Sequence, residues 1–193
     1  QYELTVTSDH GTPTGSGWYD EGAMAGWSVG TPVSGGEGIR YTADPASGSV
    51  EMTGPQTVAV TWWTTEYALT TAADPVAGGD VTPGGWYAAG TVVEIAADPA
   101  EGWAFVGWTG GAGGTVSPAT VAVDGPTSVI GHFLPLVSLE VVSARGVPAP
   151  PVGIREYVSG ASVTASVASP VTVGGTRYVC TGYTGTGSAP SGA

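Results

Sequence analysis

The stretch that decides the fold is Gly85-Trp86-Tyr87-Ala88-Ala89-Gly90-Thr91-Val92-Val93, a turn pattern followed directly by a strand-forming run. Its Tyr–x–x–Gly pattern recurs at Tyr19-Asp20-Glu21-Gly22 and at Tyr157-Val158-Ser159-Gly160. The tyrosines are spaced by 68 residues (19 to 87) and by 70 residues (87 to 157). Self-similarity at a nearly constant period indicates tandem structural repeats. The sequence therefore predicts three copies of one small unit.

The residues around these motifs favour strands over helices. No long stretch places apolar residues at i, i+3, i+4 and i+7, which is the pattern of an amphipathic helix. Gly 33 and Pro 15, out of 193 residues, supply frequent turns. Between the turns lie short runs rich in Val, Thr and aromatic residues, which suit a pleated sheet. These runs are Tyr2 to Thr7, Thr57 to Thr64, Thr91 to Ala96, Thr120 to Val123, Leu136 to Val142 and Ser162 to Val167. We expect an all-β protein with little or no helix.

The repeat boundaries follow from aligning the three motifs. We assign repeat 1 to residues 1–65, repeat 2 to 66–135 and repeat 3 to 136–193. Repeats 1 and 2 each end in two strand-like segments, predicted to be a closing hairpin, which repeat 3 lacks. The joins at 64–66 and 134–136 leave few residues for flexible linkers. We therefore expect three closely coupled small β-sheet modules, β-grasp-like or sandwich-like, arranged as an elongated rod.

Large aromatic rings recur at matching places in the repeats. A unit of about 65 residues has a poor surface-to-volume ratio, so a few large side chains must fill its core. Exposed rings would instead form a stacking platform for sugars. Cys180 aligns with Phe105 and is expected in the core, with an intermolecular disulfide as the alternative. The residues predicted to pack are Trp18, Trp62, Trp86, Trp103, Phe105, Trp108, Phe133 and Cys180.

The three repeat glycines, Gly22, Gly90 and Gly160, are predicted to lie in tight turns. Such turns need a positive φ, which glycine adopts at little cost.

The charge excludes several classes of partner. The formal net charge is −12, and all four basic residues are arginines. Nucleic acid and anionic lipid both need clustered Lys or Arg, so neither is expected to bind. No apolar run approaches the roughly 20 residues that span a bilayer. Membrane insertion is therefore not expected either.

Residues for catalysis or metal binding are few. His10 and His132 are the only histidines, and His132 falls on a predicted strand face. Ser8, Asp9 and His10 are adjacent in sequence and cannot together adopt the geometry of a catalytic triad. Asp20 and Glu21, with Asp9 near them, form the best acidic cluster for calcium, but no D-x-D-x-D run is present. We expect no enzyme activity and no cofactor, with calcium as a weak alternative.

The centre of the chain resembles a known protein family. The segments 85–93 and 97–110, with the closing segments 121–123 and 127–133, are similar to the divergent internalin-B-type B-repeat of bacterial surface proteins. The resemblance implies β-rich modules, β-grasp-like in the better-known members, strung in tandem on secreted or envelope-attached proteins. It implies no catalytic residues.

Together these patterns predict a structural role outside the cell or at its surface. The expected function is a rod-like building block of a stalk or filament, in contact with flanking repeats or other copies, with strand complementation as a route of assembly. The alternative is an adhesin or carbohydrate-binding module that uses exposed Trp and Tyr.

Overall fold

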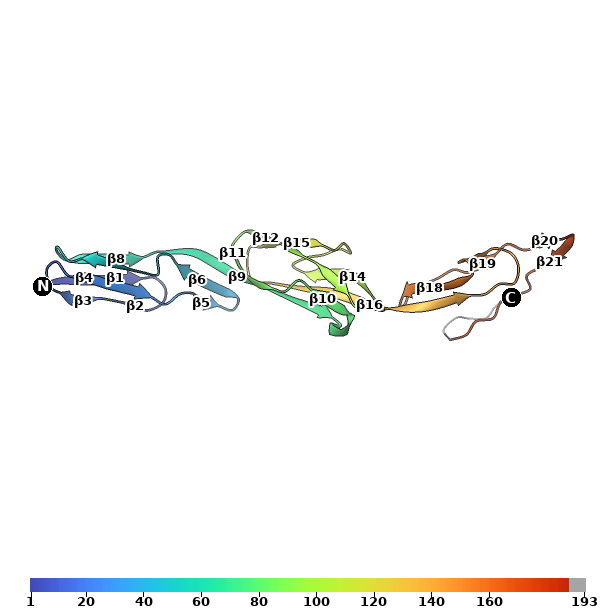
Figure 1. The fold of residues 1–193 in the computed structure, drawn as a ribbon, viewed down its shortest axis with the longest axis horizontal. Helices are drawn as coiled ribbons and strands as arrows, with labels where there is room; N and C mark the ends of the chain where they lie inside the picture. The colour runs from blue at the N-terminus through green and yellow to red at the C-terminus, as the bar shows by residue number, and fades with distance from the viewer. Residues whose placement is uncertain (188–193) are drawn as a thin grey trace. The chain divides into compact units, whose positions relative to one another are not determined.

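The computed structural model describes residues 1–187, apart from the side chains of residues 63 and 64. Strands dominate this part of the chain (Figure 1), and its one helical element is a single 3-10 turn, η1 (Val76–Gly78). The prediction of an all-β fold is confirmed. The chain divides into two compact units, Gln1–Ala100 with Phe105–Phe133, and Glu101–Ala104 with Leu134–Ala193. Repeat 1 and all of repeat 2 except residues 101–104 and 134–135 thus belong to the first unit.

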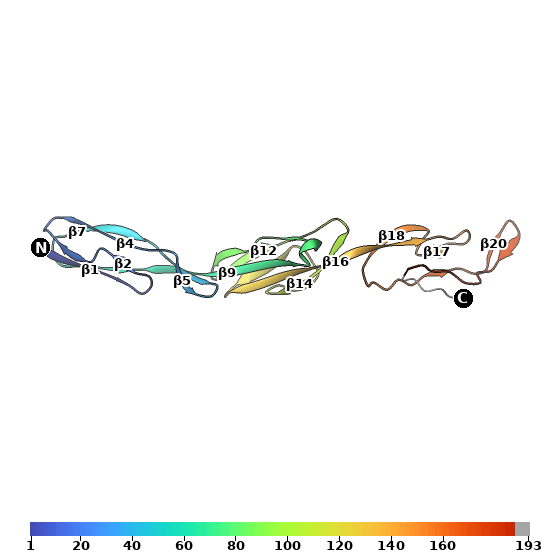
Figure 2. The ribbon, with the colours of Figure 1, turned by 90° about the horizontal axis from the view of Figure 1, so that it is seen from below.

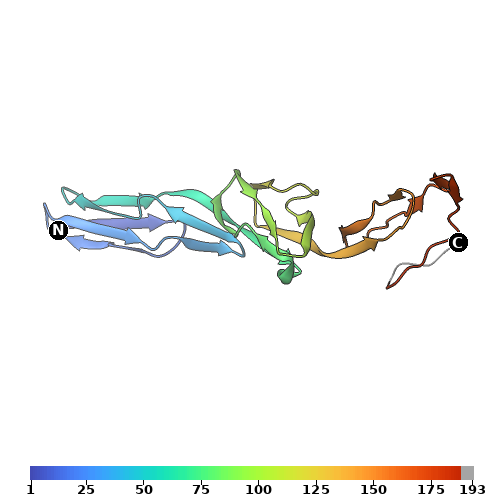
Figure 3. The same ribbon diagram turned by 45° about the vertical axis from the view of Figure 1, so that its right-hand side comes forward.

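Repeat 1 is a small sandwich of two three-stranded sheets. The first sheet has the order β3-β1-β8 and the second the order β2-β4-β7, and these strands run alongside one another in Figures 1 and 3. A hairpin of β5 (Val33–Gly36) and β6 (Ile39–Ala43) extends from them. Alternate residues point into the core, which contains Leu4, Ala25 and Met52. The sandwich strands are β1 (Tyr2–Ser8), β2 (Pro13–Thr14), β3 (Gly17–Tyr19), β4 (Met24–Val29), β7 (Ser47–Glu51) and β8 (Gln56–Val60).

Repeat 2 follows the same plan (Figure 2), and β9 and β16, with 13 and 15 residues, are longer than their counterparts β1 and β8, with 7 and 5. Its first strand pairs antiparallel with β11 and parallel with β16, as β1 pairs with β3 and β8. The opposite layer pairs β12 with β15, as β4 pairs with β7. Its strands are β9 (Trp62–Asp74), β10 (Gly79–Val81), β11 (Gly85–Ala88), β12 (Thr91–Ile95), β13 (Ala97–Pro99), β14 (Trp103–Gly110), β15 (Ala119–Val123) and β16 (Thr127–Val141).

The two closing segments of each repeat do not form the predicted hairpin. β7 pairs with β4 while β8 pairs with β1, so the chain crosses from one sheet to the other between them. The segments β15 and β16 divide in the same way. The physical reason is burial: Val123 and Val129 are both fully buried, one contributed from each layer. An arch across the core buries both strands on their apolar faces, whereas a hairpin would place them in one layer.

The joins between repeats lie inside strands. Residues 64–66 belong to β9, and residues 134–136 belong to β16. β9 pairs with β6 of repeat 1 over Trp62 to Tyr67 and with β16 of repeat 2 over Leu69 to Asp74. A shared strand, rather than a linker, therefore connects repeats 1 and 2.

Repeat 3 keeps two of the strand pairings of the earlier repeats, but its described residues form no buried core. The second half of β16 pairs with β18 (Gly153–Val158), and β17 (Pro148–Ala149) pairs with β19 (Ser166–Val167). A hairpin of β20 (Val171–Val173) and β21 (Thr176–Tyr178) follows. From residue 134 to residue 187, no residue is buried. The strand predicted over 162–167 is reduced to its last two residues.

Candidate functional site

The rings predicted to pack occupy three kinds of place. Trp108 and Phe133 are buried in repeat 2. Phe105 joins them there, with its ring centroid 4.9 Å from that of Trp108 and 5.8 Å from that of Phe133. Trp62 and Trp103 are half-buried.

The remaining predicted packing residues lie at the surface, and for them the prediction is wrong. Trp18 is 65% exposed and Trp86 is 40% exposed. Each precedes a half-buried tyrosine on a short strand, and successive side chains on a strand point to opposite faces. Packing of Tyr19 and Tyr87 therefore turns both tryptophans outward. Cys180 is also exposed, because repeat 3 has no buried core to receive it.

The repeat glycines lie in left-handed turns. Their φ angles are +77° at Gly22, +81° at Gly90 and +85° at Gly160. The first two donate backbone hydrogen bonds of 2.9 Å to the carbonyls of Met52 and Val123. These bonds connect the turn to the end of the strand that precedes the arch. The glycine turn thus has the same structural place in repeats 1 and 2.

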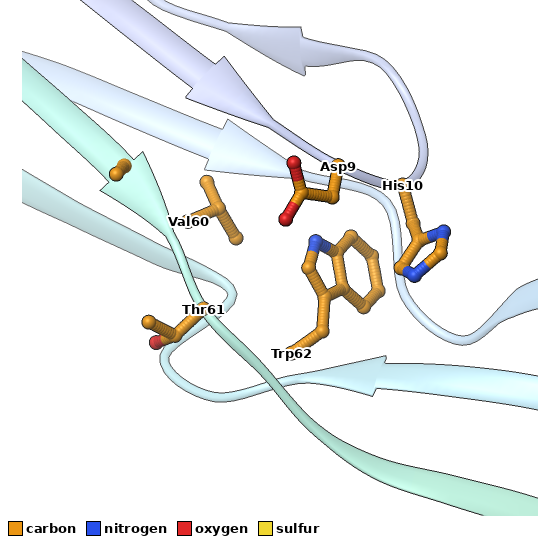
Figure 4. A pocket seen from close by; sticks show the side chains of 6 residues that line it. Asp9, His10, Val60, Thr61 and Trp62 are labelled. Atoms are coloured by element: carbon orange, nitrogen blue, oxygen red, sulfur yellow. The ribbon is translucent and has the colours of Figure 1, made fainter.

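An open depression in repeat 1 is lined by Asp9, His10 and Trp62, among others (Figure 4). The indole nitrogen of Trp62 donates a hydrogen bond of 2.9 Å to the hydroxyl oxygen of Ser8. The His10 ring stacks on Tyr41 at 3.9 Å between centroids. The Ser8 hydroxyl donates a hydrogen bond of 2.5 Å to the backbone carbonyl of His10, not to its imidazole, so the pair does not form a nucleophile with its base. The local sequence brings together Ser8, Asp9 and His10, but Tyr41 and Trp62 lie 31 and 52 residues after His10, and no local motif connects them with it.

A cluster of three polar side chains, Arg40, Thr42 and Glu66, lies where repeats 1 and 2 share β9; we refer to it as the Arg40 cluster. The Arg40 guanidinium donates to both carboxylate oxygens of Glu66, at 2.8 and 3.2 Å. Thr42 donates to the same carboxylate at 2.9 Å. The hydrogen bond from Arg40 is the main reason that the pKa of Glu66 lies below its ordinary value; burial opposes the shift and Thr42 adds to it. The shared strand therefore carries a charged carboxylate that accepts two hydrogen bonds from Arg40 and one from Thr42.

The same arginine reaches repeat 2. Its guanidinium carbon lies 4.7 Å from the ring centroid of Trp86 on β11, within the range of a cation–π contact. Arg40 and Trp86 also line a second open depression, together with residues of the β5–β6 hairpin. Arg40 thus joins three elements: its own β6, the shared β9 and β11. No local pattern in the sequence connects Arg40 with Glu66 or Trp86, which lie 26 and 46 residues further along the chain.

A polar row crosses three neighbouring strands of repeat 2. His132 is the registered partner of Asp74, with its Nδ1 3.3 Å from the Asp74 carboxylate. Its Nε2 lies 2.8 Å from the hydroxyl of Thr109. The order hydroxyl, imidazole and carboxylate is that of a nucleophilic triad. However, the row lies on an open strand surface, and none of its members lines the depressions above.

No grouping of three or more His, Cys, Asp or Glu suited to a metal ion occurs within residues 1–187. Over the same residues, no helix is long and apolar enough to cross a membrane.

Comparison with known proteins identifies the centre of the chain. Residues 69–135 match the family described as the divergent InlB B-repeat domain. The resemblance inferred from the sequence is thereby confirmed for that segment. No curated protein and no solved structure matches the chain significantly.

Proposed function

Starting from residues 69–135 as a divergent InlB B-repeat domain, we propose that the chain is a structural repeat segment of a secreted or surface-attached bacterial protein. Its role is mechanical: the repeats form a stiff, rod-like part of a stalk or filament. It has no catalytic function. The observation that carries the proposal is the strand shared by repeats 1 and 2.

A shared strand resists bending for a simple reason. Over its first half β9 is hydrogen-bonded to β6, and over its second half to β16. On its other edge β11 pairs with Glu66 to Leu69, across the change of partner. Bending at this point therefore requires breaking backbone hydrogen bonds of both repeats. Linkers of irregular chain have no such requirement.

The Arg40 cluster supports the same role. It connects Arg40 of repeat 1 to Glu66 on the shared strand and to the ring of Trp86 in repeat 2. An ion pair at the protein surface contributes at most about 1 kcal/mol, and the side chains of Arg40 and Glu66 remain partly exposed. The Arg40 cluster therefore adds little to the stiffness of the junction, and the backbone pairing of β9 supplies most of it.

The test is to interrupt the shared strand. A four-residue Gly/Ser insertion between Thr65 and Glu66 separates the two halves of β9, and the matched control places the same insertion after Gly113 in an exposed loop. Small-angle X-ray scattering should show a broadened distribution of dimensions for the first variant only. Equal scattering from both variants, with both folded by circular dichroism, would contradict a stiff junction.

A second candidate function is favoured by the exposed tryptophans. Trp18 and Trp86 occupy equivalent positions and are 65% and 40% exposed, with the Arg40 guanidinium over the ring of Trp86. Aromatic faces of this kind stack on sugar rings, so the repeats would serve as an adhesive or carbohydrate-binding surface. A glycan array with the chain and its Trp18→Ala/Trp86→Ala variant tests this. Saturable binding that the variant loses while it remains folded supports it; absence of binding by the unaltered chain contradicts it.

A further inference from the structure

The first and last strands of repeats 1 and 2 lie side by side and run in the same direction. In repeat 1, β1 pairs in parallel with the closing strand β8, over five registered residue pairs that begin at Leu4 and end at Ser8. In repeat 2, β9 pairs in the same way with β16, over six pairs that begin at Leu69 and end at Asp74. We refer to these two parallel pairs as clamp 1 and clamp 2.

The direction of these strands decides how a pulling force acts on them. Tension along the chain enters repeat 1 at the start of β1 and leaves it at the end of β8, which continues through Thr61 into β9. Because the two strands are parallel, these points lie at opposite ends of the pair, and tension slides one strand along the other. All the backbone hydrogen bonds between the two strands then resist the force together. The same holds for clamp 2, where tension enters through β9 and leaves through β16.

Both clamps are supported by the strands and the core around them. In clamp 1, β1 lies between β3 and β8, and in clamp 2, β16 lies between β14 and β9. Leu4 and Val6 of clamp 1 are buried, as are Leu69 and Val129 of clamp 2. The core therefore keeps water away from one face of each clamp, where water would otherwise replace the hydrogen bonds as they lengthen under load.

A side-chain link lies at the far end of each clamp. Beside the last pair of clamp 1, the indole nitrogen of Trp62 donates a hydrogen bond of 2.9 Å to the hydroxyl oxygen of Ser8. At the last pair of clamp 2, Nδ1 of His132 lies 3.3 Å from the Asp74 carboxylate, and its Nε2 lies 2.8 Å from the hydroxyl of Thr109 on β14. Both links join the strand on which tension enters to the segment on which it leaves, so the sliding movement stretches them as well.

We propose that repeats 1 and 2 bear tension, with the parallel pairs β1–β8 and β9–β16 loaded in shear and a side-chain link holding the far end of each pair. The inference rests on the proposed function, because a stalk or filament is pulled along its length, and it adds resistance to tension to resistance to bending. The two properties can fail separately. The Gly/Ser insertion after Thr65 interrupts β9 between the clamps and lies outside the paired residues of both.

Single-molecule force spectroscopy on the whole chain tests the proposal. The chain has no lysine, so one handle attaches at the α-amino group of Gln1 and the other at the exposed thiol of Cys180. Each clamp closes a loop of roughly 60 residues, so repeats 1 and 2 should rupture in discrete steps that each release about 200 Å of chain. Repeat 3 should extend before them, because its described residues form no buried core. Extension of repeats 1 and 2 without discrete steps would overturn the proposal.

A second pulling direction provides the control. In a Gly54→Cys/Cys180→Ser variant, the handles attach at Gln1 and at position 54, which both lie at the starting end of clamp 1. A Cβ atom added at Gly54 would have no neighbouring atom within 4 Å, so this variant should fold. The force then opens the pairs one after another, and repeat 1 should rupture at less than about half the force that it withstands in shear. Equal rupture forces in the two directions would also overturn the proposal.

Two variants of β16 test the side-chain link of clamp 2. His132→Ala removes the contacts with Asp74 and Thr109, and it should lower the rupture force of one of the two steps while the other stays unchanged. Ser128→Ala is the matched control, because Ser128 is an exposed residue of the same strand; it should change neither step. Equal rupture forces for the two variants would show that the link carries no load, contrary to the proposal.

Discussion

Leu4, Leu69 and Leu139 show how one residue type behaves in three copies of the same strand position. Their registered partners on the antiparallel neighbour are Gly17, Gly85 and Arg155. In repeats 1 and 2 the partner is a glycine, at which an added Cβ would approach the ring of Tyr19 or Tyr87, and the leucine is buried. In repeat 3 a closing strand is missing among the described residues, and the leucine is only half-buried. Burial, rather than residue type, therefore decides how much each leucine contributes to the free energy of unfolding.

Truncating the leucines measures this difference. Leu69→Ala should lower the free energy of unfolding of its repeat by about 2 to 5 kcal/mol, because it leaves a cavity in a packed core. Leu139→Ala is the matched comparison and should cost clearly less, since that side chain already contacts solvent. Urea unfolding followed by circular dichroism tests both. A larger loss for Leu139→Ala would contradict the burial described above.

Glu66 makes stability at the junction depend on pH. Its pKa is lower in the folded chain than the ordinary value of 4.5, so the folded state favours the charged form. The contribution of the pair is therefore complete above about pH 4.5 and is lost as the pH falls through the lowered pKa. Glu66→Gln should remove this part of the acid dependence while changing stability at pH 7 by no more than about 1 kcal/mol. Parallel pH profiles of both proteins would contradict the assignment.

At the scale of elements, the turn before β12 illustrates how a short motif directs the chain. Gly90 has a φ of +81°, and its amide bonds to the end of β15. The turn thereby links the start of the second layer to the strand before the arch. A Cβ atom added at Gly90 would have no neighbouring atom within 4 Å. Any loss of stability caused by a side chain at this position therefore comes from the backbone conformation alone.

Replacing glycines with alanine isolates that conformational term. Gly90→Ala should destabilise repeat 2 by about 1 to 2 kcal/mol, the cost of the left-handed region for a residue with a Cβ. Gly113→Ala provides the control, because its surroundings are equally open and its φ is not positive. It should leave the urea midpoint nearly unchanged. Equal effects would show that the left-handed turn is not the reason for Gly90.

At the scale of the whole molecule, stability should differ sharply along the chain. Repeats 1 and 2 each have a buried cluster, whereas the described part of repeat 3 has none. Local opening is easiest where few apolar contacts are buried. The arginines report on this difference, since trypsin can cut only after them in a chain without lysine. Arg40 lies in the paired junction, while Arg145, Arg155 and Arg177 are exposed in repeat 3.

Limited trypsin digestion under native conditions should therefore cut first in repeat 3. The expected result is a persistent fragment that begins at Gln1 and ends at Arg145 or Arg155, identified by mass spectrometry. Cleavage after Arg40 should appear only when urea unfolds repeat 1, which serves as the internal control. Early cleavage after Arg40 in buffer would contradict the stability of the junction.

The sequence by itself determined the all-β class, the three-fold period and the turn glycines, because these depend on local residue choice and spacing. The family resemblance over the central repeat could also be read from local motifs. Only the tertiary structure decided that the closing strands form an arch, that β9 is shared, that Trp18 and Trp86 face outward and that Arg40 meets Glu66. The physical reason is that alternation along a strand defines two faces but not which one is buried. Strand pairing joins residues far apart in the chain, which no local pattern specifies.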